Sequence, residues 1–167
     1  IADKVEGFGG KCIMTNKTHL TGTNRCLEAY NIWSKNKDIK PDIILNIQGD
    51  EPLLNPLHLK MLIKCFKDDQ TTIATLGLQI EKGEQLEEGK VYFTKDINDF
   101  AIYFSRFPIP YLRDLPKEKW TLFHEYYQHI GIYGFRKDAL IKFANMPSSS
   151  LENTEKLEQL RWLQAAE

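Results

Sequence analysis

A polar turn, Gln48-Gly49-Asp50-Glu51-Pro52, directly follows an apolar run of the chain. The Asp50 carboxylate is a hard oxygen ligand of the kind that Mg²⁺ binds together with substrate phosphates. The Gln48 side chain both donates and accepts hydrogen bonds, and Gly49 lets a ligand approach the backbone closely. The turn therefore offers groups for a metal and a nucleotide, although a purely structural turn after a buried strand explains the same residues equally well.

A second polar segment, His19-Leu20-Thr21-Gly22-Thr23-Asn24-Arg25, joins an expected strand to an expected helix. The N-terminus of a helix presents free N–H groups and a positive dipole to anions. Arg25 adds a fixed cation that suits a phosphate or a carboxylate. The segment therefore fits an anion site, and the structural alternative is simple capping of the helix by Thr21 or Thr23.

Three further segments place polar side chains on expected strands and a helix. Arg106 ends an apolar strand, a position that suits bidentate binding of a carboxylate; a surface ion pair is the alternative. His129 and Tyr133 alternate onto one face of a strand, where a core histidine beside an aromatic ring is the alternative. Glu158 and Gln159 lie on a helix, where they could also form an ordinary solvated face.

Strand and helix patterns alternate along the chain and must position these groups. We expect strands at residues 11–15, 42–47, 71–79, 91–94, 100–105 and 128–135, and helices at residues 23–34, 137–145 and 151–164, with a further helix that follows Asn55 and Pro56. This alternation predicts an α/β domain with a largely parallel sheet. In such sheets ligands gather at the carboxyl ends of the strands, where Gln48 and Asp50 are expected.

The composition excludes several classes of function. A net charge of -1 with 42% hydrophobic and 27% charged residues is ordinary for a soluble globular protein, and carries no electrostatic footprint for a nucleic acid polymer or an anionic membrane. No apolar run approaches the roughly 18 residues of a membrane-spanning helix. Cys12, Cys26 and Cys65 show no CxxC spacing, so we expect buried free thiols and a cytoplasmic location.

In order and wording, the five polar segments resemble the CMP-Kdo synthetase family, the 3-deoxy-manno-octulosonate (Kdo) cytidylyltransferases. The pattern of that family runs H-x-S-G-T-D-R, V-Q-G-D-E-P, Y-F-S-R with a following P-I-P, H-x-G-I-Y-G and L-E-Q-L-R. The matching segments here are His19–Arg25, Ile47–Pro52, Tyr103–Pro110, His129–Gly134 and Leu157–Arg161. The resemblance covers nearly the whole chain and points away from the related sialic-acid cytidylyltransferases.

The resemblance implies a Rossmann-like nucleotidyltransferase fold with a mixed, mainly parallel sheet flanked by helices, and a homodimer. It implies the reaction of CTP with Kdo to give CMP-Kdo and pyrophosphate, for lipopolysaccharide biosynthesis. The anomeric hydroxyl of Kdo would attack the α-phosphate in line, with Mg²⁺ as the cofactor. Catalysis would then rest mostly on positioning and charge stabilisation.

Roles follow from the resemblance by matched position. The nucleotide would contact Thr21, Gly22, Thr23, Arg25 and Gln48. The catalytic residues would be Asp50 and Gln48, with Asp50 as the metal ligand. The sugar acid would contact Arg106, His129, Tyr133, Glu158 and Gln159, with Arg106 on the Kdo carboxylate.

The chain departs from the family pattern in some places. Thr21 stands in place of the usual Ser and Asn24 in place of the usual Asp. We find neither the basic, Gly-containing triphosphate loop of the N-terminus nor the late G-x-D-T-P-x-D metal segment. We therefore expect residues 1–167 to be a single cytidylyltransferase domain that is part of a longer protein. The alternatives are a truncated, non-catalytic core that binds ligand weakly or only dimerises, and a cytidylyltransferase for a related sugar acid.

Overall fold

The computed structural model describes residues 1–35, 37–38, 40–49 and 54–165. The chain divides into two compact units. The first comprises Ile1–Ala74 and Ile132–Asn145, and the second comprises Thr75–Gly131 and Met146–Glu167. Strand β5, Tyr126–Arg136, supplies its early residues to the second unit and its late residues to the first.

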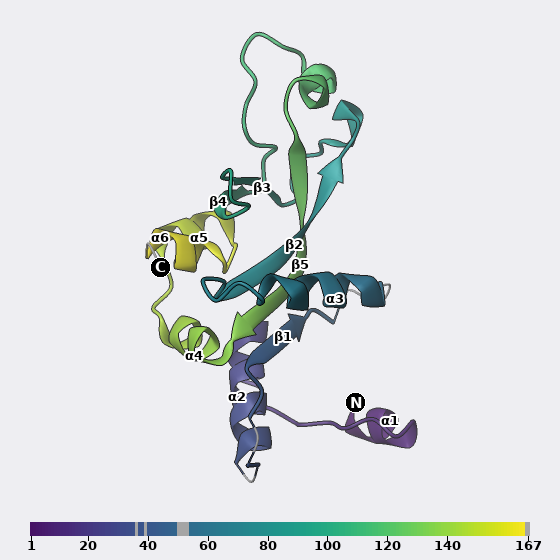
Figure 1. The fold of residues 1–167 in the computed structure, drawn as a ribbon, viewed down its shortest axis with the longest axis vertical. Helices are drawn as coiled ribbons and strands as arrows, with labels where there is room; N and C mark the ends of the chain where they lie inside the picture. The colour runs from purple at the N-terminus through teal and green to yellow at the C-terminus, as the bar shows by residue number, and fades with distance from the viewer. Residues whose placement is uncertain (36, 39, 50–53, 166–167) are drawn as a thin grey trace. The chain divides into compact units, whose positions relative to one another are not determined.

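The first unit is built from helices around one antiparallel strand pair. Its elements are α1 (Ala2–Gly7), α2 (Gly22–Ser34), β1 (Ile43–Ile47), α3 (Pro56–Cys65) and α4 (Lys137–Asn145). In the β1–β5 register, Ile43 lies opposite Arg136 and Ile47 opposite Ile132. Helices α2 and α4 contact each other and β1 (Figure 1). This packing places the start of α2 beside the end of β1.

Local sequence explains where the helices of the first unit begin. The Thr21 hydroxyl accepts a hydrogen bond from the Asn24 N–H at the start of α2. The Asn55 side chain accepts one from the Leu57 N–H at the start of α3, where Pro56 takes the first helical position. The start of α3 was predicted from Asn55 and Pro56, whereas α2 begins one residue before the expected Thr23, with Thr21 as the cap of the two that were considered.

The second unit contains the remaining strands and two short helices. Its elements are β2 (Ile73–Ile80, of which Thr75 onward lies in this unit), β3 (Tyr92–Lys95), β4 (Ala101–Ser105), α5 (Ser150–Glu155) and α6 (Leu160–Gln164), with 3₁₀ turns η1 (Gly83–Gln85) and η2 (Lys117–Leu122). Strand β3 pairs antiparallel with β4 and with the start of β5. Helix α6 contacts α5 and β4 (Figure 1). One core cluster joins Ile80, Leu86, Tyr92, Trp120 and Tyr126.

The turns η1 and η2 of the second unit pack too closely for a side chain at Gly83. A Cβ at this position would lie 2.2 Å from the Glu118 carbonyl oxygen. We expect Gly83→Ala to lower the free energy of unfolding by about 2–3 kcal/mol, because backbone must move to relieve the overlap. Urea unfolding measures this change. Gly7→Ala is the matched control, since a Cβ at Gly7 meets nothing within 4 Å; equal effects of the two variants would contradict the expectation.

The α/β fold is confirmed, but the mainly parallel sheet is not. The β1–β5, β3–β4 and β3–β5 pairs are all antiparallel, and β2 also pairs with β5. An apolar strand pattern shows that a strand is covered on its faces. It does not show which distant segment lies beside it, and here β5, far along the chain, is the neighbour of β1.

Three local predictions were wrong. Residues 11–15 do not form a strand, since no described strand pairs with them and Met14 is exposed. The helix expected at residues 151–164 is broken into α5 and α6 at Lys156, which has a left-handed backbone with φ of 55°. None of the three cysteines is buried as expected, since Cys65 is exposed and Cys12 and Cys26 are half-buried, and none of them forms a disulfide.

Every helix in the described part of the chain falls short of the length and apolar character that crossing a bilayer requires.

Candidate functional site

Predicted nucleotide-binding residues come together in the first unit, at the end of β1 and the start of α2. A Cβ at Gly22 would lie 3.4 Å from both polar atoms of the Asn46 amide and from Gln48 Nε2. The Asn46 amide also lies 3.5 Å from the Thr23 hydroxyl, to which it donates. The side chains of Gln48 and Asn46 therefore cover the first turn of α2, and a larger residue at position 22 would crowd them.

Asn46 is a site residue that was missed in the sequence. It is 3% exposed on β1, between apolar neighbours. A buried amide is costly unless it is hydrogen-bonded, so an Asn inside the run Ile-Ile-Leu-Asn-Ile is the signal that could have revealed it. Tyr133 lies directly opposite Asn46 in the β1–β5 register. Directly opposed residues share one face of the pair, so Tyr133, predicted for the sugar, belongs beside Asn46 in the first unit.

Arg25 holds the loop that leads into α2. Its guanidinium donates to the Thr15 hydroxyl at 3.2 Å, to the Asn16 carbonyl at 3.0 Å and to the His19 carbonyl at 3.3 Å. The predicted contact of Arg25 with the nucleotide remains a prediction. What the structure adds is that Arg25 fixes the path of the chain into the helix.

Glu28, one turn further along α2, binds the same loop through its carboxylate. Its carboxylate accepts a hydrogen bond from the Asn16 N–H at 2.8 Å and lies 2.5 Å from His19 Nε2. The Asn16 N–H, and then the His19 ring, hold the pKa of Glu28 below its ordinary value. The charged form is therefore the one that the loop binds.

We expect Glu28→Gln to loosen this loop without unfolding α2, because the amide keeps the shape but loses the charge. Amide hydrogen exchange at Asn16 should become roughly fivefold faster, as a charge-assisted hydrogen bond is weakened. Exchange measured by NMR or mass spectrometry reports it. Glu6→Gln, at an exposed carboxylate of α1, should leave Asn16 unchanged. Equal exchange in all three proteins would contradict this role.

In the second unit, His129 is held on several sides. Its Nε2 lies 2.8 Å from the Thr75 hydroxyl, and its ring meets Phe104 edge-on at 5.1 Å between centroids. The backbone N–H of His129 donates to the Val91 carbonyl. Burial lowers the pKa of His129 to about 4, so the ring is neutral near neutral pH. A neutral, oriented imidazole suits hydrogen bonding to an uncharged hydroxyl.

Arg106 caps the end of α5 with its guanidinium. It donates to the carbonyls of Glu155 at 2.8 Å, Lys156 at 3.3 Å and Gly89 at 3.3 Å. The Glu155 carboxylate in turn accepts from the Ser105 hydroxyl and from the Arg106 N–H. The last carbonyls of a helix need such donors. The predicted contact of Arg106 with a sugar carboxylate stays a prediction, beside this structural role.

Glu158 and Gln159 lie in the turn between α5 and α6 that Arg106 helps to anchor. Glu158 Oε1 lies 3.8 Å from an Arg161 guanidinium nitrogen. The Gln159 side-chain nitrogen is buried and has no hydrogen-bond partner in the described part of the chain. A buried amide donor without a partner is costly. This atom therefore fits a group that acquires its partner when a ligand binds.

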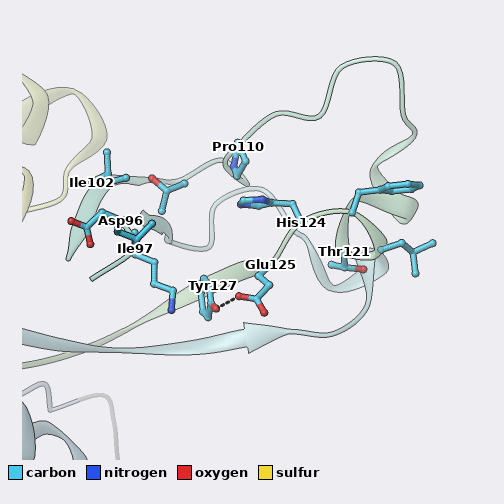
Figure 2. Close-up of a pocket in the computed structure, with 12 residues that line it drawn as sticks. Asp96, Ile97, Ile102, Pro110, Thr121, His124, Glu125 and Tyr127 are labelled. Atoms are coloured by element: carbon cyan, nitrogen blue, oxygen red, sulfur yellow. Dashed lines mark hydrogen bonds between the residues drawn. The ribbon is translucent and has the colours of Figure 1, made fainter. Parts of the chain in front are cut away.

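A broad depression elsewhere in the second unit contains none of the predicted site residues (Figure 2). Its volume is about 890 Å³. Within it, the Tyr127 hydroxyl donates to Glu125 at 2.5 Å and Lys95 lies 4.6 Å from the centre of the Tyr127 ring. Several large apolar side chains also lie exposed here, among them Ile97 and Leu122.

The expected metal site depends on the Asp50 carboxylate. Asp50, the expected ligand, lies outside the described residues. Within residues 1–35, 37–38, 40–49 and 54–165, no group of three or more His, Cys, Asp or Glu side chains could hold a metal ion.

Comparisons with known proteins agree with the motifs. A family model described as "Cytidylyltransferase" matches residues 1–167. The chain is 43% identical to the 3-deoxy-manno-octulosonate cytidylyltransferase of Phocaeicola vulgatus, over 98% of this chain and 65% of that protein. It is 37% identical to that of Escherichia coli, over 99% of this chain and 63% of that protein. The chain thus spans slightly less than two thirds of the length of these relatives.

The fold is also similar to a solved structure. CMP:2-keto-3-deoxy-manno-octonic acid synthetase complexed with CTP superposes with a TM-score of 0.85 at 35% identity, covering 99% of this chain and 64% of that chain. The family resemblance inferred from the motifs is confirmed: the chain belongs to the cytidylyltransferase family.

Proposed function

We propose that the protein activates Kdo with CTP, forming CMP-Kdo and releasing pyrophosphate, for lipopolysaccharide biosynthesis. The observation that carries the proposal is the convergence of Gly22, Thr23 and Gln48 at one end of the first unit. The names of the relatives and the CTP in the similar solved structure support it.

The nucleotide would lie at the first turn of α2. The N–H groups and positive dipole of this turn favour an anion or a base carbonyl. The Asn24 N–H is bound by the Thr21 hydroxyl and the Arg25 N–H by the Thr21 carbonyl, so a ligand would meet the Gly22 N–H and the side-chain amides of Gln48 and Asn46. Arg25 would act by holding the loop in place.

The sugar acid would meet neutral His129 and the side chains of Glu158 and Gln159. The buried Gln159 nitrogen is a donor for a carboxylate or hydroxyl oxygen, and Arg106 would bind the carboxylate with the N–H groups that its capping role does not use. These residues would bind the sugar acid and hold it in one orientation. Tyr133 would line the nucleotide-side face beside Asn46.

Mg²⁺ would be held by Asp50 and by substrate phosphates, and when bound it would neutralise the charge on those phosphates. We further propose a homodimer and a cytoplasmic location, both of which the family resemblance implies. A cytidylyltransferase for a related sugar acid is the second candidate, because none of the contacts described above recognises a substituent that is specific to Kdo.

Pyrophosphate release tests the proposal. The complete protein, with CTP and Mg²⁺, is expected to release pyrophosphate when Kdo is added and to release little with sialic acid. Release with sialic acid and not with Kdo would favour the second candidate. Release with neither sugar would overturn the assignment as an enzyme of sugar-acid activation.

A further inference from the structure

The side chain of Asn24, in the first turn of α2, makes two hydrogen bonds of opposite kind. Its Oδ1 accepts from the Thr21 hydroxyl at 2.7 Å, and its Nδ2 donates to the Ala144 carbonyl at 3.2 Å. Thr21 is the N-cap of α2, and Ala144 lies in the last turn of α4. All three residues belong to the first unit. The Asn24 amide therefore joins the beginning of one helix to the end of another.

The Ala144 carbonyl determines which way the Asn24 amide faces. A carbonyl oxygen can only accept, so the NH₂ group of the amide faces Ala144 and the amide oxygen faces Thr21. The Thr21 hydroxyl then donates its single hydrogen to Asn24 Oδ1, while its own oxygen accepts from the Asn24 backbone N–H at 3.2 Å. The three residues thus form one connected chain of hydrogen bonds, in which each group has a defined role as donor or acceptor.

Asparagine suits this position better than aspartate, which the family pattern has here. The last carbonyls of an α-helix have no partner within the helix, and the half-buried Ala144 receives a donor from Asn24 instead. A carboxylate at position 24 would still accept from Thr21, but it has no hydrogen to donate to Ala144. It would also bring a negative charge to the negative end of the α4 dipole.

We propose that Asn24 is a positioning residue, whose amide holds the first turn of α2 against the end of α4 and thereby places Gly22 for the nucleotide. Gly22 and Thr23 lie between Thr21 and Asn24, the two residues that the hydrogen bonds hold, so the position of the turn depends on this link. The link itself is independent of the proposed function, whereas its effect on nucleotide binding rests on that function.

Two physical effects oppose each other in Asn24→Asp, which makes this variant informative. A negative charge in the first turn of α2 is favoured by the dipole of that helix. If this effect dominated, the first turn would become more stable and its amide hydrogens would exchange more slowly. The proposed link predicts the reverse, because the carboxylate loses the hydrogen bond to Ala144 and faces its carbonyl oxygen.

Amide hydrogen exchange in the complete protein, corrected for intrinsic rates, tests the link. The Arg25 N–H bonds to the Thr21 carbonyl in the first turn of α2. Its exchange should become roughly fivefold faster in Asn24→Asp and also in Asn24→Ala, which removes the amide without adding a charge. Asn31→Asp, at an exposed position of the same helix, is the matched control and should leave this rate unchanged. Slower or unchanged exchange in either Asn24 variant would contradict the link.

Kinetics then connect the link to the nucleotide. Asn24→Asp should raise KM for CTP roughly three- to tenfold and leave KM for Kdo unchanged. Asn24→Ala should raise KM for CTP as well, since repulsion between a carboxylate and the phosphates is absent in that variant. Equal rises for both substrates would indicate a general structural defect and remove the positioning role. If exchange responds as expected but the natural protein releases no pyrophosphate with CTP and Kdo, the proposed function fails while the link stands.

Discussion

Arg161→Met is expected to lower the free energy of unfolding by about 3–5 kcal/mol, because it leaves a buried carboxylate without its partner. Arg161 is 7% exposed. Its guanidinium binds both oxygens of Glu152, at 2.8 and 2.6 Å, and also donates to the Met146 carbonyl. The Glu152 side chain is itself only 13% exposed. Methionine fills similar space but donates no hydrogen bond.

Urea unfolding followed by tryptophan fluorescence measures the loss, with Arg113→Met as the control. Arg113 pairs with Asp114 on the surface, where both side chains are more than three quarters exposed, at 88% and 79%. An exposed pair contributes at most about 1 kcal/mol. The two arginine variants should therefore differ by several-fold in effect. A loss below about 1 kcal/mol for Arg161→Met would mean that the buried pair does not stabilise the second unit.

The contribution of the Arg161–Glu152 pair to the free energy of unfolding should decrease in acid. The hydrogen bonds from Arg161 hold the pKa of Glu152 below its ordinary value of 4.5. A carboxylate with a lowered folded-state pKa adds stability above its unfolded pKa, and this contribution is lost as pH falls through the lower, folded value. The stability difference between the natural protein and Arg161→Met should thus shrink below pH 4.5.

Asp50→Ala is expected to abolish Mg²⁺-dependent pyrophosphate release, a loss of at least roughly a hundredfold. Metal binding to transferring phosphates supplies several kcal/mol of charge stabilisation, and each 1.36 kcal/mol is a factor of ten. Asp50 follows Gln48 and Gly49, which leave the end of β1 beside the first turn of α2. Alanine offers Mg²⁺ no oxygen ligand.

Turnover is measured at saturating Mg²⁺, CTP and Kdo. Asp42→Ala is the matched control, since Asp42 is an exposed aspartate at the opposite end of β1. It should keep most of the activity. Unchanged turnover of Asp50→Ala at saturating Mg²⁺ would remove Asp50 from the metal site, even if the protein proves to be an active cytidylyltransferase.

Elements with strong local signals could be predicted from the sequence. The helix expected at residues 137–145 is observed at Lys137–Asn145, and the strand expected at 42–47 at Ile43–Ile47. Apolar periodicity and capping residues are local properties, so a single sequence carries them. The convergence of Gly22 with Gln48 was expected from the family resemblance, which gave both residues a contact with the nucleotide.

The break at Lys156 could not be predicted in this way. The periodicity of residues 151–164 favours one helix, but Arg106, some fifty positions earlier, donates to the last carbonyls of α5. A long-range donor thus stabilises the helix end at Lys156, before the turn that carries Glu158 and Gln159. The pairing of β1 with β5 and the capping of α5 by Arg106 could not be predicted for the same reason. Both depend on contacts between residues that lie far apart in the sequence.

The buried amide of Asn46 has opposite consequences for the stability of the fold and for the proposed nucleotide binding. Most positions so deeply buried are filled by apolar side chains, which stabilise a fold without needing a partner. The Asn46 amide stabilises the fold less than an aliphatic side chain would, but it places polar atoms 3.4 Å from the Cβ position of Gly22. Selection for thermal stability alone would favour an aliphatic residue at this position, and selection for nucleotide binding would restore the amide. Variation at Asn46 among natural sequences would therefore separate proteins that need the site from those that retain only the fold.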